Sequence, residues 1–480
     1  MAVAIRMKTP SAQLRDHLQT GVTRTIEVDA RALERELHSI VRGEVRFSAG
    51  DRALYSSDAS NYRQVPIGIV IPRDKEDVIQ TVAACRRYGA PILARGGGTG
   101  IPGQSINVAV MIDFSKYMRN VIALDPQRRL ARVEAGCILD TLRDAAEKHH
   151  LTFGPDPATH NRNTLGGMVG NNSCGIHSVM AGRTSGNIEE LEILTYDGAR
   201  MRVGRTRDED LARIIGDGGR RGEIYAQLKA FRDRYADLIR RQFPRLPRRV
   251  SGYNLPELLP ENGFNVARTL VGSECTLVMV LEVTAQLVPS PPARSLLVPG
   301  YPDIFTAGDH VPEILARKPI GLEGLDDEFI EDMKKKGMHP KNLELMPAGG
   351  AWLLAEFGGE SKEESDGKAR KTMDELKSKG ATTSMKLFDD PKQERIMWYL
   401  REEGLGATAR IPGEPDNHEG WEVSRAARQA GRLPARVQKA YGQIQLHRSA
   451  LRPFRRRLPA HAIDVRSGNR QRDKEVARIS

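Results

Sequence analysis

A glycine-rich stretch, ILARGGGTGIPG, occupies the chain from Ile92 to Gly103. Glycines adopt the positive φ angles that turn several backbone N–H groups toward one anion, so a loop of this kind suits a phosphate group. Arg95, directly before the glycines, would add a fixed positive fork beside that anion. The alternative is a flexible turn without a ligand.

The spacing of Gly98, Gly100 and Gly103 also matches G-x-G-x-x-G, the pattern of dinucleotide-binding loops. That pattern requires a helix at its last glycine. Here Pro102 and Gly103 are followed by Gln-Ser-Ile-Asn and then by VAVMID, which is typical of a strand. The sequence therefore predicts a strand, a glycine-rich loop and a second strand.

A second cluster of glycines and asparagines, PDPATHNRNTLGGMVGNNSCGIHSVMAGRTSGN, runs from Pro155 to Asn187. A segment this long without evident secondary structure is either functional or disordered. Glycine and asparagine recur where the backbone must pass close to a flat group. We therefore expect an ordered binding loop here rather than a merely decorative surface loop.

Length and composition predict a globular protein of two or three domains, with 480 residues of which 39% are hydrophobic. No run of 18 apolar residues occurs, and the N-terminus lacks the apolar core of a signal peptide, so we expect a cytoplasmic protein without a transmembrane segment. The cysteines lie far apart and predict neither a disulfide framework nor a metal site. All four are expected to pack as small hydrophobic residues: Cys85, Cys137, Cys174 and Cys275.

The net charge of +11 is concentrated at one end of the chain. Residues 423–480 contain 13 Arg and 2 Lys against 3 acids, a net charge of +12, which leaves the first 422 residues at −1. A strongly basic protein invites a nucleic-acid hypothesis. This hypothesis is less favoured when the first 422 residues are almost neutral and only the C-terminal segment is basic.

The periodicity of apolar residues predicts the elements that position these loops. Residues 1–45 are expected to form an N-terminal helical arm. A βαβ unit follows, with a strand at 67–71, a helix that Asp74 caps and Gly89 ends, and a strand at 91–94 that brings Arg95 to its carboxyl end. Further strands are expected at 108–112, 130–134, 192–196 and 278–288, and helices at 138–149 and 223–242.

Four segments, ILARGGGTGIPG, PDPATHNRNTLGGMVGNNSCG, GNIEELEILTYDG and LVGSECTLVMVLEVTAQLVP, together resemble the FAD-binding domain of the FAD-linked oxidase family, the vanillyl-alcohol oxidase type. The resemblance implies an α+β protein, with a PCMH-type two-subdomain FAD-binding fold at 46–290 and an incomplete α+β substrate domain, the cap, at 291–422. The chain is most similar to the D-lactate, D-2-hydroxyglutarate and glycolate dehydrogenases, in particular the long bacterial members fused to an iron–sulfur module. No iron–sulfur cluster is expected in this chain.

The resemblance also implies a set of contacts with FAD. The backbone of one loop would hold the pyrophosphate: Arg95, Gly96, Gly97, Gly98, Thr99 and Gly100. Two further groups would line the ribityl chain and the isoalloxazine: Pro155, Asp156, Thr164, Leu165, Gly166 and Gly167, then Asn171, Ser173, Cys174, Gly175 and Gly182. A last group would meet the adenine end or the ring: Asn187, Ile188 and the turn Gly272, Ser273 and Glu274. Relatives usually have glycine in place of Cys275.

Covalently flavinylated relatives often carry a histidine within the loop that begins at Arg95, and this chain has none there. Non-covalent FAD is therefore expected. His160 and His177 are expected to be hydrogen-bonded loop histidines rather than flavin attachments.

The cap should contain a strand followed by an amphipathic helix, because MPAGGAWLLAEFGGESKEESDGKARKTMDELK has that pattern. In ERIMWYLREEGLGATARIPG, Arg401 aligns with the family arginine that grips the substrate carboxylate. A bidentate guanidinium suits a 2-hydroxy acid. The alternative is that Arg401 belongs to an exposed charged face of a helix.

The segment from Val423 to Ser480 fits neither the family nor any amphipathic pattern. Ser449 to Pro459 can be encoded so that a shift of one nucleotide reads Ala-Leu-Tyr-Gly-His-Phe-Gly-Ala-Gly-Cys, which contains the Tyr-Gly-His motif that relatives place over the flavin. We therefore expect a frameshifted tail, whose positive charge implies no partner. The chain as given would then lack the base and the metal-ligand motifs, so no metal is expected.

The leading hypothesis is thus an FAD-dependent 2-hydroxyacid dehydrogenase acting on a small hydroxy acid, with an unidentified electron acceptor and without nucleic acid. In this reaction type hydride leaves C2 of the substrate for N5 of the flavin. One alternative is a nucleic-acid-binding protein, which a tail with one aromatic, Phe454, near its arginines disfavours. The other is the UDP-sugar-reducing branch of the same flavin fold.

Overall fold

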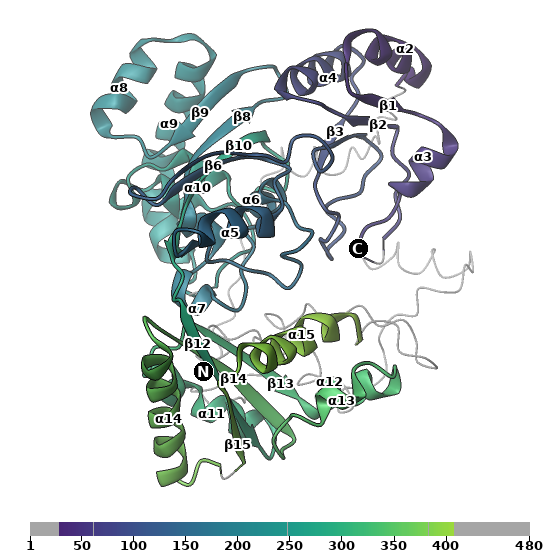
Figure 1. The fold of residues 1–480 in the computed structure, drawn as a ribbon. Helices are drawn as coiled ribbons and strands as arrows, with labels where there is room; N and C mark the ends of the chain where they lie inside the picture. Colours follow the sequence, from purple (N-terminus) through teal and green to yellow (C-terminus); the bar gives the residue numbers. More distant parts are fainter. Residues whose placement is uncertain (1–27, 61, 247, 383, 408–480) are drawn as a thin grey trace, which may run out of the picture.

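The computed structural model describes residues 28–407 except 61, 247 and 383. These residues form two α+β parts, an N-terminal part (residues 28–289) and the cap (residues 293–407), which a short linker joins (Figure 1). The predicted tail at 423–480 and the last residues predicted for the cap lie outside the described residues. Among the described residues no helix is long and apolar enough to cross a membrane.

The first sheet of the N-terminal part has the strand order β1-β2-β4-β3. The strands are β1 (Glu44–Arg46), β2 (Gly68–Ile71), β3 (Ile92–Arg95) and β4 (Val110–Asp113). Strand β4 pairs in parallel with both β2 and β3, and helix α4 (Lys75–Arg87) connects β2 to β3. Asp74 caps α4, and Gly89 has a φ of 61° after it, which confirms the predicted βαβ unit. No helix separates β3 from β4, so the predicted strand, loop and strand are confirmed.

Helix α2 (Ala30–Ile40) is present where a helix was expected, but it is not a free arm. Leu33 and Leu37 are fully buried and belong to the same apolar cluster as Val70 and Val110 of the first sheet. The helix therefore forms part of the core of this sheet, and β1 extends the sheet just after it. The short helix α3 (Ala49–Leu54) follows.

The second sheet of the N-terminal part is antiparallel, with the order β5-β6-β10-β8-β9. Its strands are β5 (Val121–Asp125), β6 (Leu130–Glu134), β8 (Ile188–Leu194), β9 (Arg200–Gly204) and β10 (Met279–Gln286). The helices around it are α5 (Leu139–Glu147), α6 (Leu165–Asn171), α7 (Ser178–Ala181), α8 (Asp208–Gly216), α9 (Gly219–Gln242) and α10 (Val266–Leu270), with the 3-10 turns η1 (Thr184–Asn187), η2 (Leu255–Leu258) and η3 (Pro260–Asn262). The strand predicted at 278–288 ends in a separate short strand, β11 (Val288–Pro289), which pairs with β7 (Leu151–Thr152).

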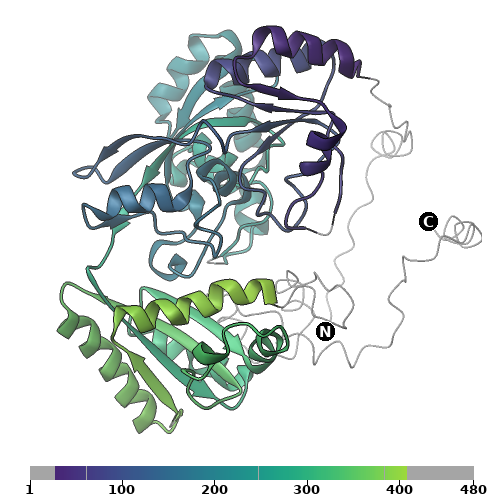
Figure 2. The same ribbon diagram turned by 45° about the vertical axis from the view of Figure 1, so that its right-hand side comes forward.

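The cap is an antiparallel sheet in the order β13-β14-β12-β15, with helices on both faces. Its strands are β12 (Ala293–Tyr301), β13 (Gly321–Asp326), β14 (Ala351–Gly359) and β15 (Met385–Phe388). Helices α11 (Ile304–Leu315) and α14 (Lys362–Ser378) cover one face, and α12 (Asp327–Lys335) and α15 (Pro391–Ala407) cover the other, with α13 (Pro340–Leu343) nearby. The predicted strand and amphipathic helix are β14 and α14. Figures 1 and 2 both show α15 on the side of the cap that faces the N-terminal part.

Candidate functional site between the two parts

The glycine-rich loop after β3 packs directly against the segment that leads into α6. A Cβ atom on Gly96 would lie 2.1 Å from Oγ1 of Thr164, and one on Gly97 would lie 2.2 Å from the carbonyl oxygen of Arg162. These positions have no room for a side chain. Two of the segments predicted to hold the cofactor, far apart in the sequence, are therefore in contact.

Helix α6 occupies part of the long segment that the sequence analysis expected to be a loop. Thr164 caps it by accepting a hydrogen bond from the backbone N–H of Gly167 at 3.2 Å. Gly166 lies so close to Ala135 at the end of β6 that a Cβ atom would be 2.8 Å from its carbonyl oxygen. The prediction of a segment without secondary structure is wrong here, because close packing on the second sheet stabilises a helix that contains glycines.

The turn from Gly272 to Cys275 completes this region. The backbone N–H of Gly272 donates to Val169 at 2.8 Å, and that of Glu274 donates to Gly170 at 3.0 Å, so the turn lies against α6. Sγ of Cys275 accepts a hydrogen bond from the N–H of Ala94 at 3.4 Å, which links the turn to β3. Glu274 and Cys275 have φ angles of 49° and 62°. Glycine, which the family resemblance led us to expect in place of Cys275, adopts such angles without strain.

The guanidinium of Arg95, predicted to be a fixed positive fork beside an anion, is fixed by backbone carbonyl groups of the surrounding loops. It donates to the carbonyl oxygens of Ser57 at 3.0 Å, Ser105 at 3.3 Å and Tyr55 at 3.4 Å. It also lies over the ring of Tyr55, 5.3 Å from the centroid. The side chain stabilises the loop instead, and the backbone of residues 96–100 is what remains for an anion.

The segments around Asp156 and Gly175 touch through their backbones. A Cβ atom on Gly175 would lie 2.0 Å from the carbonyl oxygen of Asp156. Pro155 is buried beside Asp156. Cys174 is half-buried with a free thiol, whereas Cys85 and Cys137 are fully buried, as expected.

Other residues predicted to contact the cofactor hold the loop itself together. Oδ1 of Asn171 accepts a hydrogen bond from Gln104 at 3.1 Å, and the carbonyl oxygen of Ser173 accepts one from the N–H of Thr184 at 3.0 Å. The amide of Asn187 donates to Ala181 at 2.7 Å and to Arg183 at 2.8 Å. Ile188 and Leu165 are fully buried in the core of the second sheet.

The structure thus brings the end of β3, the start of α6 and the turn at 272–275 together at one place. Gly98 has a φ of 62°, and Gly97 is exposed at the loop surface. Bare backbone at an exposed loop, with no space for side chains behind it, suits the close approach of a pyrophosphate. The residues present therefore fit FAD, which the loop at 96–100 would hold.

Arg401 lies on α15 and is buried, so the alternative of an exposed charged helical face is wrong. Its Nη2 atom is 2.8 Å from Oε2 of Glu323 on β13, and the two side chains are 6% and 2% exposed. Burial raises the pKa of Glu323, while the charges of Arg401 and Arg248 lower it. The ion pair thereby fixes the guanidinium of Arg401 against the cap sheet.

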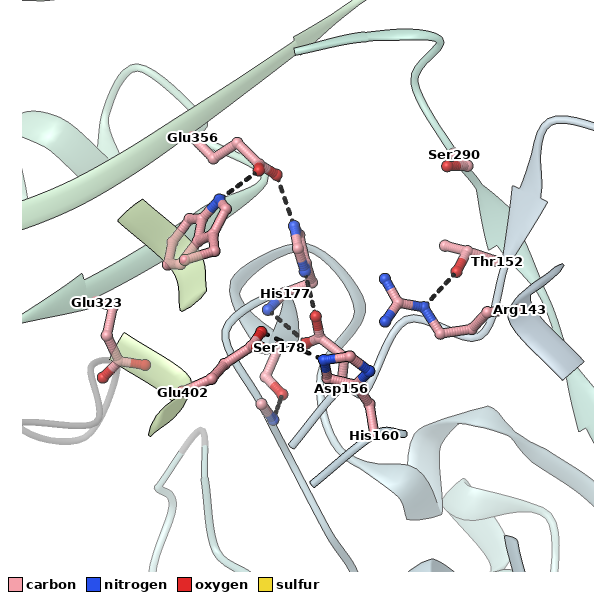
Figure 3. A network of polar contacts seen from close by, with 12 residues as sticks. Arg143, Thr152, Asp156, His160, His177, Ser178, Ser290, Glu323, Glu356 and Glu402 are labelled. Carbon is pink, nitrogen blue, oxygen red and sulfur yellow. Dashed lines mark hydrogen bonds and ion pairs between the residues drawn. The ribbon is translucent and has the colours of Figure 1, made fainter. Parts of the chain in front are cut away.

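Both loop histidines are hydrogen-bonded, as predicted, and both reach the cap. His160 lies 2.7 Å from Asp140 and 3.3 Å from Glu402 on α15, and these two carboxylates raise its pKa to about 9. His177 lies between Asp156 and Glu356 (Figure 3). Burial opposes a charge on His177, but the two carboxylates raise its pKa to about 10.

The sequence did not predict the acidic residues of the cap as members of the site. Glu356 is the single charged residue of AWLLAEFGG, the wholly buried strand β14, and Glu323 stands in the buried strand GLEGLD. A lone carboxylate within an apolar strand signals a buried ion pair, because an unpaired charge there is too costly. This signal could have identified Glu356, although not its partner. Glu323 shares its strand with Asp326, so it lacks this signal.

A cavity of about 530 Å³ lies where α7 meets the cap, lined by Gly182, Ser178, Met180, Arg248, Lys318 and Ile320 among others. Gly182 has a φ of 72° and faces open space. Among residues 28–407, with the gaps named above, no three His, Cys, Asp or Glu side chains are arranged to hold a metal ion.

Comparison with protein families gives two matches, in chain order. Residues 66–204 match the FAD binding domain, and residues 290–420 match the C-terminal domain of FAD linked oxidases. The second match ends just before Val423, the residue at which the sequence analysis expects the frame to change.

Among individual proteins, the chain is 28% identical to D-2-hydroxyglutarate dehydrogenase of Pseudomonas putida over 80% of this chain and 39% of that one. It is 25% identical to glycolate oxidase subunit GlcD of Escherichia coli, over 73% of this chain and 60% of that subunit. D-lactate dehydrogenase of Anaerostipes hadrus is 24% identical over 70% of this chain and 61% of that one. The chain therefore spans less than two thirds of the length of each of these relatives.

A solved structure of alkyldihydroxyacetonephosphate synthase superposes with a TM-score of 0.55 at 19% identity, covering 78% of this chain and 64% of that one. At this identity the likeness concerns the fold alone. It agrees with the PCMH-type α+β fold that the sequence implied. Because the two domains of this family are both matched, in order, the chain belongs to the FAD-linked oxidase family.

Proposed function

We propose that this chain is a flavoprotein of the 2-hydroxyacid dehydrogenase type, which binds FAD without a covalent bond and takes a small 2-hydroxy acid as substrate. The observation that carries the proposal is the meeting of the glycine-rich loop, α6 and the turn at 272–275 on the N-terminal part, opposite a cap that presents the buried Arg401. FAD, when bound, supplies an acceptor for hydride at N5.

The chain's own residues would bind FAD and orient the hydroxy acid. Backbone N–H groups of the loop at 96–100 hold the pyrophosphate. Thr164 caps α6 and so holds the start of this helix beside the loop. Arg401 binds the carboxylate of the hydroxy acid, and Glu323 fixes the direction of the guanidinium. The base that would accept the hydroxyl proton is expected only in the restored reading frame after residue 422, not in this chain. We infer a cytoplasmic location.

The test is purification of the full chain followed by acid precipitation. The yellow flavin should appear wholly in the supernatant as FAD. Flavin in the pellet would show a covalent bond, and a colourless protein would overturn the proposed function. Titration with D-lactate, glycolate and D-2-hydroxyglutarate should then perturb the absorption spectrum of bound FAD.

The role of Arg401 has a matched control on the same helix. Arg401→Gln should weaken binding of the hydroxy acid by about 10-fold or more, because a charged hydrogen-bonding pair contributes about 1.5–3 kcal/mol. Arg395→Gln changes an exposed arginine of α15 and should leave binding unchanged. Equal effects of the two substitutions would exclude a specific role for Arg401.

A further inference from the structure

His177 bridges the two parts of the protein through both nitrogens of its ring. Nδ1 lies 2.5 Å from Oδ2 of Asp156 in the N-terminal part, and Nε2 lies 2.6 Å from Oε2 of Glu356 in the cap (Figure 3). The side chains of His177, Asp156 and Glu356 are 11%, 7% and 2% exposed. The bridge is therefore almost completely removed from solvent.

On the cap side, other groups fix the position of Glu356. Nε1 of Trp398 on α15 donates to Oε1 of Glu356 at 2.8 Å, and Arg294 on β12 lies 3.6 Å from Oε2. Glu394 on α15 also forms a hydrogen bond with Glu356. Burial and this carboxylate neighbour raise the pKa of Glu394 to about 9, so Glu394 is protonated at neutral pH and donates. Three side chains from two elements of the cap, α15 and β12, thus hold one carboxylate.

On the other side, the bridge is attached to backbone. Oδ1 of Asp156 accepts a hydrogen bond from the N–H of His177 at 2.9 Å. Gly175, two residues earlier, packs on the backbone of Asp156 without room for a Cβ atom. A displacement of His177 must therefore displace the segments at 155–156 and 173–177 together.

We propose that His177 is a positioning residue, which sets the two flavin-facing segments of the N-terminal part according to the position of the cap. The proposal rests on the proposed function and on the family resemblance, which implies that these segments line the flavin. It gives the cap a second role beside presenting Arg401, namely control of the shape of the flavin site from β14.

The chemistry of the bridge makes this coupling strong. A protonated imidazole donates from both nitrogens, and here each N–H has its own carboxylate. Removing one partner leaves a buried charge without compensation, which is strongly destabilising. A glutamine at 177 has a similar length, but its oxygen would face one of the two carboxylates. Only a protonated ring satisfies both parts at once.

The experiment is a double-mutant cycle in the full chain, with His177→Gln, Glu356→Gln and the combination of both. For each protein the dissociation constant of FAD and the circular dichroism of the flavin absorption bands are measured. Each single substitution should weaken FAD binding by roughly tenfold and alter the dichroism. The double substitution should do no more than His177→Gln alone, since both changes abolish the charged contact between residues 177 and 356. His149→Gln, at an exposed position of the N-terminal part, is the control and should change neither quantity.

Glu356 belongs to the cap, whereas the flavin-facing segments belong to the N-terminal part. An effect of Glu356→Gln on the flavin therefore reports coupling between the two parts rather than a local contact with the flavin. Normal FAD binding and dichroism in Glu356→Gln would overturn the proposal, as would a lowered melting temperature without a flavin change in both variants. Should Glu356→Gln not yield folded protein, Trp398→Phe removes one hydrogen bond to Glu356 and should shift the dichroism in the same direction; an unshifted spectrum would overturn the proposal. A full chain of wild-type sequence that binds no FAD would overturn the proposed function first, and this inference with it.

Discussion

At the scale of single residues, the glycine-rich loop depends on positions that have no room for a side chain. A Cβ atom at Gly97 would lie 2.2 Å from the backbone of Arg162, although Gly97 itself is exposed to solvent. The loop is thus fixed on one side by packing and open on the other. Substitutions in it should impair the cofactor site more than the stability of the domain.

We expect Gly97→Val to abolish FAD binding, because the side chain separates the loop from residues 162–164 and obstructs the pyrophosphate. The melting temperature of the FAD-free protein should change little. Gly367→Ala, at an open position of α14, is the matched control and should bind FAD normally. FAD measured at full stoichiometry in Gly97→Val would show that the loop is only a turn.

Glu394 supplies a second prediction at this scale. Its pKa is about 9 in the folded protein against 4.5 for an ordinary glutamate, so the folded state binds one proton more between these values. Its stabilising contribution is complete below pH 4.5 and is lost as the pH rises toward 9, by at most about 1.4 kcal/mol per pH unit. Glu394→Gln keeps a donor for Glu356 without titrating. Its melting temperature should therefore fall less than that of the wild type between pH 6 and pH 9, and parallel curves would contradict the assignment.

At the scale of elements, helix α2 belongs to the core of the N-terminal part, although the sequence predicted a helical arm there. Its buried leucines pack on the first sheet. Amphipathic spacing predicts a helix there but does not say against which surface it packs. That surface is formed by strands that follow later in the chain.

Leu37→Ala should consequently lower the stability of the N-terminal part by about 2–5 kcal/mol, the usual cost of a cavity at a fully buried leucine. Thermal unfolding monitored through bound FAD measures this. Arg35→Ala, on the exposed side of α2, should have almost no effect. A free arm would give equal results for both substitutions.

The elements that were predicted correctly are those marked by residues close together in the sequence, such as helix caps and apolar runs. Asp74 and Gly89 mark the ends of α4, and the apolar runs on either side of it mark β2 and β3. Helix α6 was not predicted, because Gly166, Gly167 and the left-handed Asn172 are typical of loops. Only packing on the second sheet makes this segment helical. The contact between Glu356 and His177 was not predicted, because the two residues lie 179 positions apart in the chain. Spacing carries no information about such a contact.

At the scale of the whole molecule, the two parts meet through polar contacts between α15 and β14 of the cap and the loops that carry His160 and His177 (Figure 3). In the proposed function, the hydroxy acid reacts between the parts and Arg401 orients it. Catalysis would also require a base for the hydroxyl proton.

We expect the 480-residue chain not to oxidise D-lactate, D-2-hydroxyglutarate or glycolate at a useful rate, even with FAD bound. Loss of a positioned base lowers a rate by roughly 10²- to 10⁴-fold. Restoring the reading frame near Val423 should bring turnover, measured with an artificial electron acceptor. Comparable turnover by the unrepaired chain would contradict the interpretation of residues 423–480.

Strand β10 lies in the middle of the second sheet, between β6 and β8, although it is the last of the five strands along the chain. Until residue 286 has been synthesised, β6 and β8 lack the neighbour that joins them, and both expose unpaired edges. A gene interrupted before this codon should therefore yield a product that aggregates or is degraded. One interrupted after the linker at 290–292 leaves every strand of both N-terminal sheets in place. A frame change at Val423 would thus spare the part of the protein that folds around the cofactor.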